Sequence, residues 1–392
     1  MLMKILFKTL LIVVCLSACT SSSVSTTQKS RQKPVFLDDH FTGFDLITIE
    51  TEQYIFALDN EMKEMVATEL KTERNMNKRT LKLIDNIFAN NEKSISYEKN
   101  ANVTARDAYH NNAANCLSLT IMAYALATEA GLNARFQQID IPEYWVRNGQ
   151  YNLLTGHINL LVNNRLIRKN IISERHGLQI DFDPQASKST FKKNIIDKNT
   201  VLAMFYNNKG AESLIDADYI TAYGYLKAAV LIAPSFSPAW SNLGILYKLT
   251  DQYREAKVAY RYAISLDNDN LTALENLAIL LSQQGNIEDA QVIKQQLHLK
   301  RRKNPYYYAL LADEAFNKGQ IGQAIQLYNK AIKLERRAHE FYYRLATVYS
   351  HTGEIRLAKK ALTRAIAYTK NRQTEDFYVA KLNVLGYSNN KY

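Results

Sequence analysis

The second half of this 392-residue chain repeats with a period of 34 residues. Blocks that begin at Ser237, Leu271, Pro305 and His339 follow one another without an insertion. Within each block, large and small apolar residues recur at positions 4, 7, 8 and 11, and again at positions 20, 24 and 27. Each of these two sets marks one face of a helix. The period therefore predicts a row of helix pairs, each packed on the next.

The four blocks agree at these positions with one exception, Lys294 at position 24 of the second block. The other members are Trp240, Leu243, Gly244, Tyr247, Ala256, Tyr260, Ala263, Leu274, Leu277, Ala278, Leu281, Ala290, Leu297, Tyr308, Leu311, Ala312, Ala315, Ala324, Tyr328, Ala331, Tyr342, Leu345, Ala346, Tyr349, Ala358, Leu362 and Ala365. Gly285, Gly319, Gly353 and the polar Asp251 fall between the paired helices, where a left-handed residue is expected. In period and pattern these blocks resemble tetratricopeptide repeats.

A fifth, degenerate repeat is expected to begin near Ala203. One period before the first clear block, four residues fit positions 20, 24, 27 and 32: Ala222, Leu226, Ala229 and Pro234. We therefore expect an all-α solenoid over residues 203–370 and a C-terminal cap or tail over residues 371–392. The resemblance implies a protein or peptide ligand on the concave face. The basic run at residues 300–303 is expected to be a solvated turn between two repeats.

The first residues of the chain resemble a bacterial lipoprotein signal. Two lysines precede a short apolar stretch, which is too short to span a bilayer as a helix, and Leu-Ser-Ala-Cys follows at residues 16–19. The resemblance implies a signal peptide over residues 1–18, lipid attachment to Cys19 and anchorage in the bacterial cell envelope. Thr20 in place of Asp implies the outer membrane, facing the periplasm. Residues 19–35 are expected to be a flexible tether.

A net charge of +11 suggests attraction to anionic surfaces, although a lysine-rich surface without an anionic partner explains it equally well. A nucleic-acid partner is not expected in an exported protein. Of the three cysteines, Cys15 lies in the cleavable segment and Cys19 is the lipidation candidate. Cys116 is then the single thiol of the mature chain. It begins an apolar helix predicted over residues 115–130 and ending at Gly131, and a helix N-terminus favours the thiolate.

Strands are predicted after this helix, over residues 134–139, 156–162 and 178–184. His157 lies at the start of the second strand, and Asp181 and Asp183 lie in the third. The two aspartates share a face of the strand, so either could meet His157. We favour Asp181, because Ile180 and Phe182 flank it in the apolar alternation, and keep Asp183 as the alternate. His110 and His176 are rival bases in polar surroundings, where solvated roles are expected.

The order Cys, His, Asp is that of the papain-like and transglutaminase-like enzymes. Residues 104–107, 115–118, 130–134, 157–159 and 181–184 resemble motifs of the transglutaminase-like superfamily. The resemblance implies an α+β domain over residues 36–200, with a central helix against an antiparallel sheet, ahead of the all-α solenoid. It also implies Cys116 as nucleophile, His157 as base and an aspartate that orients the imidazole, with neither metal nor organic cofactor. The family usually has glycine where this chain has Ala114, and a positive φ there would strain alanine.

Three functions remain open at this stage. The leading one is a lipid-anchored transglutaminase-like enzyme that acts on an amide of a protein or peptide through a thioester on Cys116, with the solenoid recruiting the substrate. The second is a catalytically inert thiol domain in a tetratricopeptide scaffold for an envelope complex. The third is a cysteine peptidase or peptidoglycan amidase with the same residues.

Overall fold

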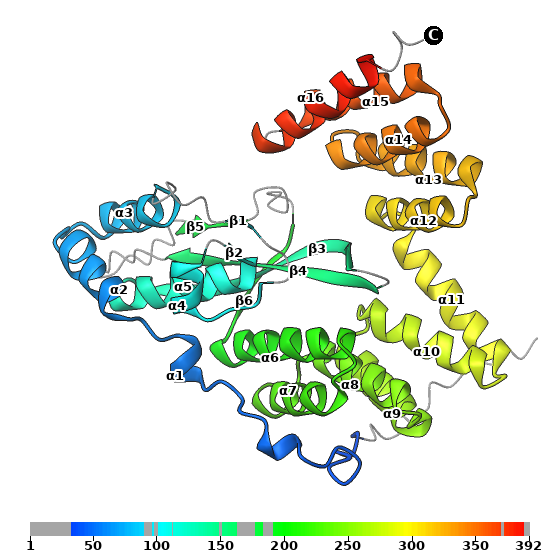
Figure 1. The fold of residues 1–392 in the computed structure, drawn as a ribbon. Helices are drawn as coiled ribbons and strands as arrows, with labels where there is room; N and C mark the ends of the chain where they lie inside the picture. Colours follow the sequence, from blue (N-terminus) through cyan, green and yellow to red (C-terminus); the bar gives the residue numbers. More distant parts are fainter. Residues whose placement is uncertain are drawn as a thin grey trace, which may run out of the picture.

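In the computed structural model, a part that mixes helices and strands is followed by a curved row of helix pairs (Figure 1). The structure describes residues 33–89, 96–97, 101–111, 113–148, 151–162, 177–182, 191–369 and 372–387. The predicted signal peptide, Cys19 and Asp183 lie outside these ranges. Among the helices within them, none combines the length and apolarity that crossing a membrane requires.

The first part of the chain is built around one buried helix, α5 (Cys116–Glu129). Asn115 caps its start, because its side-chain oxygen accepts the Ser118 N–H at 2.9 Å, and Gly131 turns the chain after its end with φ of 73°. Eleven of its fourteen residues are buried, as predicted for an apolar helix. The helical elements before it are a 3-10 turn (Phe44–Leu46), α1 (Glu52–Ile55), α2 (Asn60–Met65), a π-helical turn (Val66–Leu70), α3 (Met76–Ala89) and α4 (Ala105–His110).

A small antiparallel sheet packs against α5. Its order is β5 (Leu178–Ile180), β4 (Tyr151–Val162), β3 (Ala134–Asn148) and β6 (Lys193–Ile196), and its pairs are all antiparallel. Tyr124 of α5 stacks on Phe136 of β3 with ring centroids 4.3 Å apart, which fixes the helix on the sheet. A helix against an antiparallel sheet is thus present, as expected. Two short strands, β1 (Ser96–Tyr97) and β2 (Ala113–Ala114), form a separate parallel pair.

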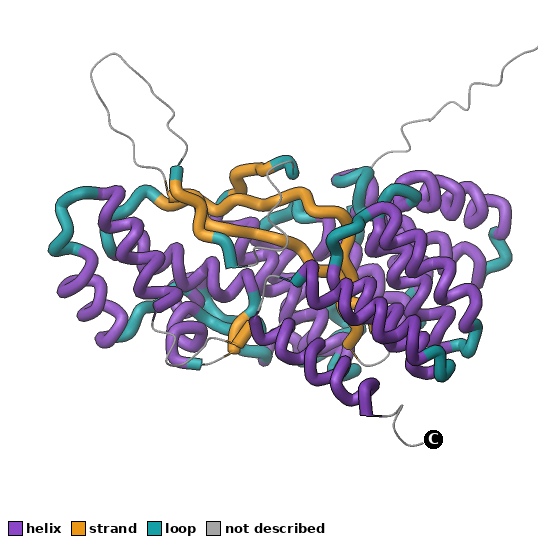
Figure 2. Tube along the Cα trace, turned by 90° about the horizontal axis from the view of Figure 1, so that it is seen from above, coloured by secondary structure: helices purple, strands orange, loops and turns teal. Residues whose placement is uncertain are grey.

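The second part of the chain is the predicted solenoid. Its helices are α6 (Lys198–Ile215), α7 (Tyr219–Ile232), α8 (Ser237–Leu249), α9 (Tyr253–Leu266), α10 (Leu271–Gln283), α11 (Ile287–Arg301), α12 (Pro305–Asn317), α13 (Ile321–Leu334), α14 (His339–His351), α15 (Ile355–Tyr368) and α16 (Arg372–Tyr387). Seen from above, the strands cross over the helices and extend toward the solenoid (Figure 2). α6 lies between the sheet and α7 (Figure 1).

The turns inside the helix pairs adopt the predicted left-handed conformation. Gly285, Gly319 and Gly353 have φ of 77°, 73° and 76°, and Asp251 has φ of 63°. Ala217, one period before Asp251, has φ of 58°. The turn between α6 and α7 therefore has the same left-handed conformation as the turns of the clear repeats.

Small residues at position 8 let the two helices of a pair approach closely. A Cβ added to Gly244 would lie 2.6 Å from the ring of Tyr260. One period earlier, a Cβ added to Gly210 would lie 2.7 Å from Leu226. The degenerate repeat thus uses the same contact between positions 8 and 24.

The segment before α1 packs on the first helices of the solenoid, although we placed residues from 36 onward in the first domain. Phe41 stacks on Tyr223 of α7 with ring centroids 4.4 Å apart. Asp38 accepts a hydrogen bond from the Tyr223 hydroxyl at 2.6 Å and pairs with Lys227 at 2.6 Å. The two parts of the molecule are consequently bound together from the start of the described chain.

The stacking of the repeats changes between α11 and α12. The second helices α9, α13 and α15 are followed by an extended residue, whereas α11 continues through Arg301 and ends on a helical Arg302. The apolar core also divides there: one buried cluster extends from Phe41 to Ala290, and the next begins at Tyr308. We call the segment from Arg301 to Asn304 the joint of the solenoid.

The prediction of a solvated turn at residues 300–303 is wrong in part, because Lys300 and Arg301 belong to α11 and Arg301 is buried. Arg301 exposes only 3% of its surface, whereas Lys300, Arg302 and Lys303 are exposed. The reason is that acidic residues from two other elements lie beside the Arg301 guanidinium and compensate its burial.

Candidate functional site

Cys116 occupies the first residue of α5 and is 6% exposed. It is not part of a disulfide. One turn along the helix, the Thr120 hydroxyl lies 2.7 Å from the Cys116 carbonyl oxygen and 3.4 Å from the Ile158 carbonyl oxygen of β4. The first turn of α5 is therefore held against the strand that carries His157.

His157 of β4 and Asp181, which directly follows β5, lie together. His157 Nε2 is 3.0 Å from Asp181 Oδ1, and both side chains are largely buried. The same carboxylate accepts hydrogen bonds from Asn159 Nδ2 at 3.2 Å and Gln179 Nε2 at 3.3 Å. The carboxylate can therefore orient the imidazole through Nε2 and leave Nδ1 for a reacting group.

No role was assigned from the sequence to Asn159, although it lies in the motif at residues 157–159, or to Gln179. A signal for them was present, because each is two residues from a predicted site residue on the same strand: Asn159 from His157, and Gln179 from Asp181. Side chains two apart on a strand share a face. Carboxamides at such positions are suited to hold a buried carboxylate by hydrogen bonds.

The structure also bears on Ala114 and on the rival residues His110, His176 and Asp183, which left the catalytic assignment open. Ala114 lies in β2, and it is not among the described residues with positive φ, so the expected backbone strain is not present. His110 pairs instead with Asp59, with Nε2 2.5 Å from Oδ2. His176 and Asp183 lie outside the described residues.

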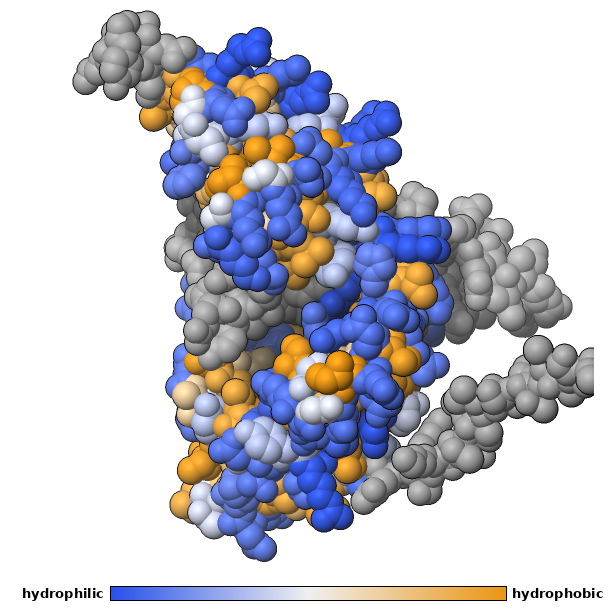
Figure 3. All heavy atoms as spheres, turned by 90° about the vertical axis from the view of Figure 1, so that its right-hand side faces the viewer, coloured by the Kyte–Doolittle hydropathy of each residue, from blue (hydrophilic) through white to orange (hydrophobic). Residues whose placement is uncertain are grey.

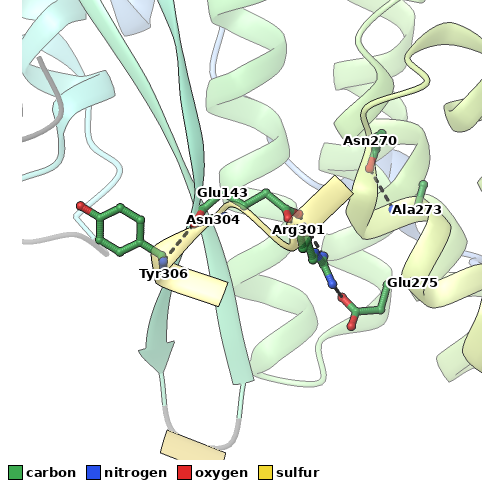
Figure 4. A network of polar contacts seen from close by, with 7 residues as sticks. All are labelled: Glu143, Asn270, Ala273, Glu275, Arg301, Asn304 and Tyr306. Carbon is green, nitrogen blue, oxygen red and sulfur yellow. Dashed lines mark hydrogen bonds and ion pairs between the residues drawn. The ribbon is translucent and has the colours of Figure 1, made fainter. Parts of the chain in front are cut away.

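A second cluster of polar side chains joins the sheet to the solenoid (Figure 4). Arg301 Nε and Nη2 donate to the two carboxylate oxygens of Glu143 on β3, at 2.7 and 3.0 Å. Arg301 Nη1 donates to Glu275 of α10 at 3.0 Å. Asn304 Nδ2 donates to the main-chain oxygen of Glu143 at 2.8 Å. We call Glu143, Glu275, Arg301 and Asn304 the Arg301 cluster.

The electrostatics of the Arg301 cluster follow from burial and charge. Burial alone would lower the pKa of Arg301, but hydrogen bonding to Glu143 and the charges of Glu275 and Glu143 offset this and raise it. The guanidinium therefore stays charged. A two-pronged contact between arginine and carboxylate is also strongly directional, so the cluster fixes the position of β3 on the joint.

Neither cluster lines the surface hollow found in the described part of the chain. This hollow of about 560 Å³ is lined by the turn before α9, by α9 as far as Arg261 and by Gln284, none of which belongs to the sites above. Within the described ranges, no three His, Cys, Asp or Glu side chains are grouped so that they could hold a metal ion.

Comparison with known protein families identifies the repeats. A family described as tetratricopeptide repeat matches residues 249–314, one described as TPR repeat matches residues 312–353, and a further tetratricopeptide repeat family matches residues 339–372. The C-terminal half of this chain therefore contains tetratricopeptide repeats, as the 34-residue period predicted.

Among curated proteins, the chain is similar to BBSome complex member BBS4 of Xenopus tropicalis, with 27% identity over 175 residues, which are 44% of this chain and 33% of that protein. It is 40% identical over 58 residues to the N-terminal acetyltransferase A complex auxiliary subunit NAA15 of Arabidopsis thaliana, covering 15% of this chain and 6% of that one. This chain thus spans about a third of the length of BBS4.

Among solved structures, Pseudomonas aeruginosa PilF matches at 18% identity with a TM-score of 0.28, covering 47% of this chain and 85% of PilF. YrrB, a TPR protein with an unusual peptide-binding site, matches at 16% identity with a TM-score of 0.25, covering 46% of this chain and 92% of YrrB.

Proposed function

We propose that this protein is an interaction scaffold whose tetratricopeptide repeats bind a partner protein or peptide. The observation that carries the proposal is the run of five helix pairs with matching turns and contacts, since such an array offers a long surface and little chemistry. The proposed binding surface is the concave face, formed by the first helices of the pairs. Residues 36–200 are then a thiol domain docked on this scaffold.

Position-specific photo-crosslinking tests the scaffold. A photoreactive amino acid replaces Ile279 of α10 or Thr347 of α14, which lie on the first helices of their pairs and are exposed. Val292 of α11, exposed on a second helix, is the matched control position. We expect partner adducts from Ile279 and Thr347 and none from Val292. Equal adducts from the three positions, or none, contradict binding on that face.

The thiol domain has a second candidate function, as a transglutaminase-like acyltransferase or a hydrolase. The contact between His157 and Asp181, together with the place of Cys116 at the start of α5, favours it. The Cys116 thiolate would attack an amide carbonyl to form a thioester, and His157 would return the proton to the departing amine. A second amine or water would then attack the thioester and release the thiolate.

Alkylation followed by amine labelling tests this second function. A reactive Cys116 is alkylated by iodoacetamide well below pH 8, where an ordinary thiol with a pKa of about 8.5 is mostly protonated. Cys116→Ser gives the background, and the unfolded chain shows that the reagent labels the thiol once it is accessible. Incorporation of a labelled primary amine indicates transfer, and shortened peptides indicate hydrolysis. If the native thiol is not alkylated at pH 7, the enzymatic function is contradicted and the scaffold is the one proposed function that remains.

Lipid attachment at Cys19 would place this scaffold on the periplasmic side of a bacterial outer membrane. The Leu-Ser-Ala-Cys sequence supports this location. In a bacterial host, Cys19→Ala should abolish incorporation of a labelled fatty acid and release the chain from membranes. Labelling that persists in Cys19→Ala contradicts the proposed attachment site.

A further inference from the structure

Glu143 is held on the solenoid in the way that a bound peptide residue is held. Its carboxylate accepts hydrogen bonds from Nε and Nη2 of Arg301, and its main-chain oxygen accepts a hydrogen bond from Asn304 Nδ2. Both side-chain and backbone groups of one extended residue are thus recognised.

The solenoid supplies the other side of this contact from three places. Glu275 of α10 holds Arg301 at 3.0 Å, and the Tyr307 ring of α12 lies 5.5 Å from the guanidinium carbon. Asn304 also caps α12, because its side-chain oxygen accepts the Tyr306 N–H at 2.9 Å. These contacts within the solenoid hold Arg301 and Asn304 in position. The site that binds the glutamate therefore does not depend on β3 alone.

The position of the Arg301 cluster in the solenoid explains why a strand can reach it. The cluster lies at the joint, where α11 continues through Arg301 and the apolar core divides. β3 packs directly on α12 at this place. The surface on the solenoid side of the molecule is mostly polar, with apolar residues in small groups (Figure 3). Recognition through charge and hydrogen bonds suits such a surface.

We propose that Glu143 is an internal ligand of the solenoid, and that a glutamate in an extended segment of a partner protein takes its place on Arg301 and Asn304. This inference rests on the proposed scaffold function and adds the chemistry of the partner. An internal ligand lowers the apparent affinity for an external one by the fraction of time it occupies the site. The net charge of +11 favours the approach of an acidic segment.

A peptide with the sequence of residues 138–148, carrying a fluorescent label, tests the proposal by anisotropy with the full chain. Glu143→Gln in the chain weakens the internal ligand while it keeps the shape of the side chain. We expect this variant to bind the peptide at least tenfold more tightly than the native chain. The matched control is Glu288→Gln on the exposed start of α11, which should bind as the native chain does.

Two further arms show that the binding uses the proposed contacts. A peptide that carries glutamine at the position of Glu143 should bind the Glu143→Gln chain no more tightly than the native chain. The double variant Arg301→Met, Glu143→Gln should also lose the gain in peptide affinity. The double variant Arg302→Met, Glu143→Gln, which changes the adjacent exposed arginine, should keep that gain. Equal affinity of the native chain and Glu143→Gln for the peptide overturns the proposal. If crosslinks from Ile279 and Thr347 still form in that case, the scaffold function stands and the internal ligand alone is refuted.

Discussion

Glu212 of α6 has a carboxyl group that is unusually hard to ionise. Burial raises its pKa to about 7 from an ordinary 4.5, against the opposing charge of Lys209 and with the help of Asp216. The folded state therefore binds a proton that the unfolded state releases at lower pH. The stability from this proton is complete below about pH 4.5 and is lost as the pH rises through 7.

Glu212→Gln should remove this pH dependence. We expect the variant to gain stability relative to the native chain as the pH rises from 4.5 to 7, and to keep a constant advantage above that range. Urea unfolding at pH 5 and pH 8 measures it. The same difference between the two chains at both pH values contradicts the assignment.

Ala217 carries a left-handed backbone conformation that alanine disfavours, with φ of 58°. Ala217→Gly should stabilise the chain by about 0.5–1 kcal/mol, because the relief of about 1–2 kcal/mol of strain exceeds the added backbone entropy of glycine. Ala228→Gly in the interior of α7 is the control, and it should destabilise by about 1 kcal/mol. Equal losses in the two variants would show that the turn is not strained.

Some site residues could be predicted from the sequence and others could not. The choice of Asp181 rested on the apolar residues on either side; the structure places Asp181 beside His157, and Asp183 lies outside the described residues. Arg301 was misread, because its charge indicates solvent unless the partners are known. Glu143 and Glu275 are 158 and 26 residues away from Arg301 in the chain, and the 34-residue period does not predict that either lies beside it.

Helix pairs of the solenoid depend on the small residue at position 8. Gly210→Ala would place a Cβ 2.7 Å from the Leu226 side chain, so that side chain or the two helices must shift. We expect a loss of about 1–3 kcal/mol. Gly322→Ala in α13 meets nothing within 4 Å and should be neutral or stabilising by up to about 1 kcal/mol. Thermal unfolding of both variants measures the contrast, and equal melting temperatures contradict the packing argument.

At the scale of secondary-structure elements, the sequence predicted most of the solenoid helices, since the position of a residue in the 34-residue repeat determines where each helix begins and ends. The exception is the end of α11, where the chain stays helical through Arg301. Local sequence did not indicate the contacts made there, because Arg301 binds Glu143 of β3 and Glu275 of α10, which lie elsewhere in the chain. Likewise, the β1 and β2 pair is too short to show an alternating pattern.

At the scale of the whole molecule, the buried apolar residues of the described ranges form three clusters, and the joint separates the first cluster from the two that follow it. Helices α12 to α15 should therefore exchange their amide hydrogens through a separate opening, at a lower free energy than α6 to α9. Glu143→Ala should lower that opening free energy by about 1.5–3 kcal/mol, because it removes hydrogen bonds to a charged group. Native-state hydrogen exchange measures it. A uniform loss over all the repeats would mean that the solenoid opens as one unit.

The arrangement of the two parts was the least predictable feature. The sequence indicated a thiol domain followed by repeats, but not that residues before α1 pack on α7 or that β3 reaches α12. Such contacts join distant residues without a local pattern. The solenoid is therefore best treated as one assembly with the domain that precedes it.

The most direct test of the scaffold is hydrogen exchange of the full chain with the partner that crosslinking identifies. We expect protection on the first helices of the repeats, namely α10, α12 and α14, and unchanged exchange at the start of α5 and in β4. Protection confined to the residues around Cys116 and His157, with none on the repeats, would contradict the account and make the partner a substrate of the thiol domain.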